Sequence, residues 1–99
     1  MQALLIAAMA FTYGCETAPP VQEMSDARQA IAVAKEAGAE QKAAIHLKAA
    51  EGYLESAEQK LSDREFSQAR RDAKQAKMKA LDALKASETA SDSAMDDAL

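Results

Sequence analysis

Residues 66–86 read FSQARRDAKQAKMKALDALKA and carry the most regular helical pattern of the chain. Six of its residues recur at alternating spacings of three and four positions, which places them on one face of an α-helix. They are Phe66, Ala69, Ala73, Ala76, Ala80 and Ala83. Because this stripe is almost entirely alanine, it predicts a helix that a neighbouring helix can approach closely.

A second stripe with the same spacing precedes the first. Its members alternate between large and small side chains: Leu47, Ala50, Leu54, Ala57 and Leu61. Ser62 and Asp63 interrupt the pattern, which leaves a turn of only about four residues before Phe66. So short a connection forces the two helices to run antiparallel. The sequence therefore predicts an antiparallel helical hairpin over about residues 42–86.

A shorter helix is predicted over about residues 25–37. Ser25 and Asp26 can cap its start, and Gly38 is suited to end it. The predicted fold class is all-α, a three-helix arrangement of this helix and the hairpin. Several apolar residues of the hairpin lie off its two stripes: Ile45, Tyr53, Met78, Leu81 and Leu84. We expect them to pack against the first helix in the core. The alternative is that they bind another chain.

The chain begins with an apolar run that ends at Gly14-Cys15 and contains no charged side chain before Glu16. Such a run is too short to cross about 30 Å of hydrocarbon, but it suits a secretory signal. The small residue directly before a unique Cys resembles the bacterial lipobox, in which the Cys is acylated and becomes the new N-terminus. We interpret residues 1–14 as a lipoprotein signal peptide, Cys15 as the lipid attachment site, and residues 15–24, which contain Pro19 and Pro20, as an extended tether. The alternative is an incidental thiol in an uncleaved apolar arm.

Composition narrows the function classes. The chain has 99 residues, two Phe, two Tyr, no Trp and one Cys, so it forms one small domain without an internal disulfide. Residues 65–86 carry six basic and three acidic side chains, whereas residues 87–99 carry four acidic and no basic ones. The overall charge of −4 argues against nucleic-acid binding. We expect residues 87–99 to be an acidic disordered tail.

Few residues suggest chemistry. The only histidine, His46, has no carboxylate or Cys at helical spacing, so we expect it at the surface. Glu51, Glu55 and Glu58 share a helix face and are interpreted as a solvated, ion-paired face. The one basic cluster is a candidate contact for anionic lipid head groups or an acidic protein. It comprises Arg70, Arg71, Lys74 and Lys77. The alternative is that its side chains are ordinary solvated charges without a partner. We expect no catalytic activity, cofactor, metal or small-molecule substrate.

The helical region resembles a family of small bacterial lipoproteins known as domain of unknown function 4398. The residues that carry the resemblance are Asp26-Ala27-Arg28-Gln29-Ala30-Ile31, Ala37-Gly38-Ala39-Glu40, the Leu47 to Leu61 stripe, and Phe66-Ser67-Gln68-Ala69-Arg70. The resemblance implies a location in the cell envelope and no known activity. Under the lipoprotein sorting rule, Glu16 after the Cys favours the outer membrane.

We therefore expect a lipid-anchored, periplasm-facing module that binds or scaffolds at the envelope, with a protein partner or a second copy contacting the hairpin. The alternative is a chaperone-like or stress-related periplasmic protein that binds exposed apolar segments of clients. A spacer linked covalently to the cell wall ranks last, because the chain ends Asp97-Ala98-Leu99 without the lysine that such a link uses.

Overall fold

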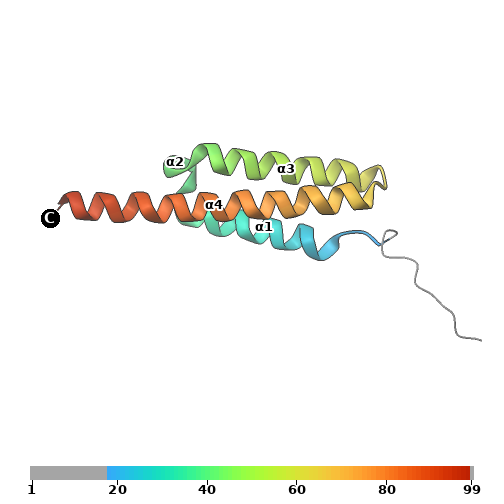
Figure 1. The fold of residues 1–99 in the computed structure, drawn as a ribbon, viewed down its shortest axis with the longest axis horizontal. Coiled ribbons are helices and arrows are strands. Elements are labelled where there is room, and N and C mark those ends of the chain that lie inside the picture. Colours follow the sequence, from blue (N-terminus) through green and yellow to red (C-terminus); the bar gives the residue numbers. More distant parts are fainter. Residues whose placement is uncertain (1–17, 99) are drawn as a thin grey trace, which may run out of the picture.

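The computed structural model describes residues 18–98, with side chains through Met95. These residues form four helices: α1 Val21–Glu36, α2 Ala39–Lys42, α3 Ala44–Ser62 and α4 Phe66–Ala98. The 33 residues of α4 make it about 50 Å long. It runs the length of the domain, with α3 along one side and α1 along the other (Figure 1). The predicted all-α fold class is confirmed.

The turn between α3 and α4 lies where Ser62 and Asp63 predicted it. Arg64 adopts a left-handed backbone with φ 62°, its N–H donates to Leu61 O, and the N–H of Glu65 donates to Lys60 O. These two hydrogen bonds satisfy carbonyls at the end of α3 and form a Schellman motif. The motif reverses the chain, so that α4 returns antiparallel along α3.

Gly38 ends the first helical segment, as its sequence position predicted. Its φ of 88° lies in the left-handed region that favours glycine. The single turn of α2 follows at once, and Ala43, with φ −147° and ψ 46°, separates it from α3. The second long helix therefore begins at Ala44 rather than at about residue 42.

The core is built mainly from alanine. Each alanine of the predicted α4 stripe is fully buried, whereas Phe66 is only partly buried. Larger side chains come from the flanking helices, namely Met24 and Ile31 from α1 and Leu47 from α3. Small residues on α4 let α1 and α3 pack against the same helix at once. The stripe also extends one step further, because Ser87 is fully buried and its Oγ donates to Ala83 O at 2.8 Å.

Two predicted segment boundaries are wrong. First, α1 begins at Val21, so residues 21–24 of the predicted tether (residues 15–24) are helical. Of the described residues, only 18–20 precede the helix. Pro20 directly precedes α1, is fully buried, and accepts a hydrogen bond from the N–H of Met24 at 3.0 Å. A proline fits this position because its fixed φ and missing N–H cost nothing at a helix start. Residues 1–14 and Cys15 lie outside the described residues.

Second, the acidic segment of residues 87–99 is helical as far as Ala98 rather than disordered. It contains no glycine or proline to stop α4, and its first part contacts the domain. Ser87 is buried, and Lys42 of α2 donates a hydrogen bond to Ser91. None of the helices in residues 18–98 is long and apolar enough to cross a membrane.

Candidate functional site

The predicted basic cluster does not form a single surface. Arg70 turns toward the start of α1, where its Nε lies 3.4 Å from Glu23 Oε2 and its Nη2 donates to Ala18 O at 3.1 Å. Its side chain is only 27% exposed. Arg70 therefore holds the N-terminal end of α1 against α4 and is not free to meet a partner.

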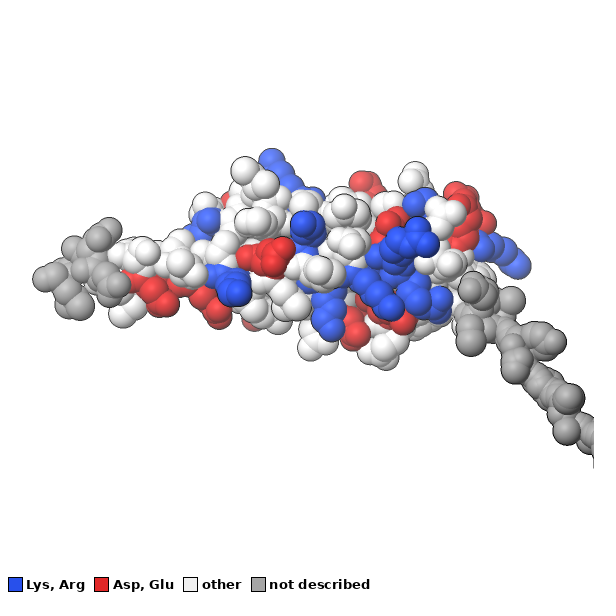
Figure 2. Space-filling view, viewed as in Figure 1, with Lys and Arg blue, Asp and Glu red and all other residues white. Residues whose placement is uncertain are grey.

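The other three members of the cluster, Arg71, Lys74 and Lys77, are exposed. Lys77 lies at the edge of α1, where it lines a shallow groove of about 240 Å³ with Leu81. In Figure 2, basic side chains gather over the first half of α4, and acidic side chains lie toward its C-terminal end. The exposed charges of α4 thus change from mainly basic to mainly acidic along its length.

A second stripe runs along α4 on the side opposite the alanine core. Its members are separated by alternating steps of three and four residues, and all are exposed: Arg71, Lys74, Met78, Leu81, Lys85, Glu88, Asp92 and Met95. We call this set the outer stripe. Met78 is 57% exposed, Leu81 45% and Met95 68%. Exposed apolar side chains at helical spacing, rimmed by charge, are the pattern of a helix-binding surface.

The prediction that the off-stripe apolar residues fill the core is wrong for most of them. Met78, Leu81, Ile45 and Tyr53 are exposed, and Leu84 alone among the five packs against the core cluster. For Met78 and Leu81 the reason is that the alanine stripe of α4 already faces both α1 and α3, so the other face of α4 stays exposed.

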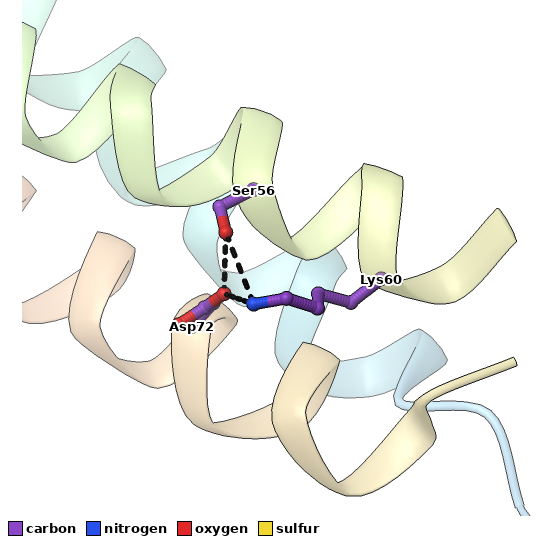
Figure 3. Close-up of polar contacts among 3 residues, drawn as sticks. All are labelled: Ser56, Lys60 and Asp72. Carbon is purple, nitrogen blue, oxygen red and sulfur yellow. Dashed lines mark hydrogen bonds and ion pairs between the residues drawn. The ribbon is translucent and has the colours of Figure 1, made fainter. Parts of the chain in front are cut away.

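A polar cluster fastens α3 to α4 near their shared turn (Figure 3). Asp72 Oδ2 accepts from Ser56 Oγ at 2.6 Å and from Lys60 Nζ at 3.1 Å. Burial raises the pKa of Asp72, but the hydrogen bonds from Ser56 and Lys60 and the charges of Lys60 and Arg71 outweigh it, leaving the pKa below its ordinary 3.8. The carboxylate is therefore charged at neutral pH, and the cluster acts in packing.

The predicted carboxylate face is ion-paired, although with α1 rather than with its own helix. Lys35 Nζ lies 3.1 Å from Glu51 Oε2, and Arg28 Nη2 lies 3.1 Å from Glu58 Oε2. These pairs border a groove of about 520 Å³ between α1 and α3. His46 is exposed on α3, as expected.

Comparison with known proteins places this arrangement in a family. Residues 22–99 match the domain of unknown function DUF4398. The chain belongs to the DUF4398 family. The match begins one residue inside α1 and includes the remaining helices, so the outer stripe lies within the DUF4398 domain. No curated protein and no solved structure matches the chain significantly.

The outer stripe is the surface of this DUF4398 domain that is best suited to a macromolecular contact. The sequence does not predict this surface for two reasons: its pattern favours Met78 and Leu81 in the core, and the composition of residues 87–99 predicts disorder. The outer stripe can nevertheless be found in the sequence, because its residues repeat with the same three- and four-residue spacing as the alanine stripe. This repeat continues without a break from Arg71 to Met95.

Proposed function

We propose that this protein is a non-catalytic lipoprotein of the bacterial cell envelope, whose helical domain binds or scaffolds other molecules at the membrane. The observation that carries the proposal is the exposure of Met78 and Leu81 between the charged residues of the outer stripe. Water-exposed apolar side chains of this size are stabilised when a partner covers them. DUF4398 is the family that the sequence resembles, and the envelope location is what that resemblance implies.

Anchoring is proposed through the thiol of Cys15. Its support comes from the sequence: an apolar run precedes this unique cysteine, Gly14 stands directly before it, and Glu16 directly after it favours sorting to the outer membrane. Cleavage before Cys15 would leave a lipidated N-terminus a few residues ahead of α1. The domain would then stay close to the periplasmic face of the membrane.

Contact with anionic groups is proposed through Arg71, Lys74 and Lys77. These exposed cations lie on successive turns at the basic end of α4. Each basic side chain near an anionic lipid surface contributes about 1 kcal/mol, and this attraction is screened within about 10 Å at 0.1 M salt. Such a contact orients an anchored domain, and it weakens as ionic strength rises.

Intact mass spectrometry of the membrane-extracted protein tests the anchor. We expect a chain that starts at Cys15 and carries acyl groups, and we expect Cys15→Ser to remain unprocessed. The change Thr17→Ser is the matched control, because it makes a similarly small change two residues away and should leave lipidation intact. An unmodified chain from Met1 to Leu99 in the membrane fraction would contradict the proposal.

A chaperone-like role is the second candidate, and the exposure of Ile45 at 83% on α3, on a different helix from the outer stripe, favours it. A client-binding protein presents scattered apolar side chains to many sequences, whereas a scaffold presents one surface. Binding of a hydrophobic dye separates the two roles. Strong fluorescence that Ile45→Lys abolishes would support client binding, and a silent protein would support scaffolding.

A further inference from the structure

The outer stripe of α4 has two halves of opposite charge. Arg71 and Lys74 make its first half basic, whereas its second half contains Lys85 but is acidic on balance because of Glu88 and Asp92. All five are exposed, and none of them is in an ion pair within the described residues. A helix face that is basic at one end and acidic at the other complements its own copy only when the two copies run antiparallel.

The apolar residues give this pairing a register. If Met78 of one copy lies opposite Leu81 of the other, two-fold symmetry places Leu81 opposite Met78, so the four side chains form one apolar centre. The same register sets Arg71 opposite Glu88, because both residues lie about 8.5 positions from the midpoint of the pair. The apolar contact and the contact of Arg71 with Glu88 therefore agree on a single alignment.

Lys74 and Lys85 face each other in this register, and their repulsion is compensated by nearby carboxylates. Asp82 and Glu88 lie three residues before and after Lys85 on the same helix. Residues three apart on a helix are neighbours, so each lysine pair lies within reach of carboxylates of the same helix face. The long methylene stems of the lysines can cover the apolar centre while their ammonium groups stay in water.

We propose that the DUF4398 domain of this protein self-associates, with the outer stripe of α4 packing antiparallel against the outer stripe of a second copy. This inference rests on the proposed function, because it names the partner of the same surface and depends on the lipid anchor for concentration. The stretch from Arg71 to Glu88 is about 25 Å long. With a helix face about 10 Å wide, each copy contributes a few hundred Å², less than the ~800 Å² of a standard interface.

An interface of this size gives a weak dimer in solution and a stronger one on a membrane. Confinement of both copies to one bilayer raises their effective concentration without any new contact. The dimer is therefore a property of the anchored protein. It remains measurable in solution at high protein concentration.

A charge exchange tests the pairing. The full-length chain carrying Cys15→Ser is studied by analytical ultracentrifugation from about 10 μM to about 1 mM, a range that covers weak dissociation constants. We expect a monomer–dimer equilibrium. Arg71→Glu alone and Glu88→Arg alone should each raise the dissociation constant about tenfold, because each change replaces two attractions by two repulsions across the two-fold axis.

The double variant Arg71→Glu with Glu88→Arg should restore the original dissociation constant. The two positions are about 25 Å apart on one helix, so they cannot compensate each other within a single chain. Glu55→Arg on α3 is the matched control, because this exposed carboxylate lies off α4 and its change should leave association unaltered. Circular dichroism of each variant verifies that the helices are intact.

Three results would overturn the pairing: a monomer at every concentration, no loss of association in the single variants, or no recovery in the double variant. The lipid anchor is measured separately by intact mass. If the wild-type protein is lipidated but the Cys15→Ser chain stays monomeric, self-association alone is refuted. If the wild-type protein is not lipidated but the Cys15→Ser chain dimerises, the anchor alone is refuted.

Discussion

The same substitution at two glycines is expected to change stability in opposite directions. Gly52 lies in the middle of α3 and is exposed, and an added Cβ there meets no atom within 4 Å. Glycine in a helix interior is about 1 kcal/mol less favourable than alanine, because it loses more backbone freedom on folding. Gly52→Ala should therefore stabilise the domain by about 0.5–1 kcal/mol.

Gly38→Ala should destabilise it, although the space around the residue is adequate. A Cβ at Gly38 would lie 3.4 Å from Lys42 Cε, which is an ordinary contact. The cost comes from the backbone, since a φ of 88° places an L-residue in the left-handed region at about 1–2 kcal/mol. Alanine also restricts the unfolded chain more than glycine does, which offsets about 0.4–1 kcal/mol of this cost. The free energy of unfolding should therefore fall by about 1 kcal/mol.

The two variants should thus differ by about 2 kcal/mol. For a domain of this size a change of 1 kcal/mol moves the melting temperature by about 4–8 °C, so their melting temperatures should differ by roughly 8–16 °C. Thermal unfolding followed by circular dichroism at 222 nm measures both against the wild-type chain. If both variants shift in the same direction, or if Gly38→Ala melts with the wild type, the assignment of the Gly38 turn is refuted.

Three further perturbations test the packing. Urea unfolding should show that the wild type is more stable than Asp72→Asn. This difference in stability should be complete above pH 3.8, the ordinary pKa, and should decline as the pH falls through the lower pKa of Asp72 in the folded protein. A difference that does not depend on pH would contradict the charged cluster. Ala76→Leu should cost about 1–3 kcal/mol by forcing buried helices apart, whereas Ala90→Leu, exposed on the same helix, should change stability by less than about 0.5 kcal/mol. Arg70→Ala should speed proteolysis at the start of α1, whereas Arg71→Ala should not; equal rates would count against the contact of Arg70 with Glu23.

Local signals in the sequence predicted the helices and two of their ends. The Ala69 to Ala83 stripe is buried throughout, Gly38 ends the first helical segment, and the break at Ser62-Asp63 separates α3 from α4. Each of these signals acts over a few residues, through backbone conformation or through the period of the helix. Such features can be predicted without knowing which helix packs against which.

The candidate surface could not be predicted in the same way. An exposed Met78 and a buried one have the same sequence pattern, and only the placement of α1 and α3 along the alanine stripe of α4 decides between them. Arg70 and Arg71 are adjacent and chemically identical, yet only Arg70 points toward Glu23. Helix period relates a residue to its own helix, whereas exposure depends on the neighbouring helices, which come from distant parts of the chain.

Helix period, glycine conformation and turn length are local properties, so the amino-acid sequence predicts that this chain forms alanine-faced helices joined by short turns. The tertiary structure alone decided that α4 is the central helix, that Pro20 is buried rather than part of a tether, and that the acidic segment continues α4. It also decided that one face of α4 remains uncovered. Small alanines let α1 and α3 pack on the two flanks of the same alanine stripe of α4, which leaves the face with Met78 and Leu81 exposed to water.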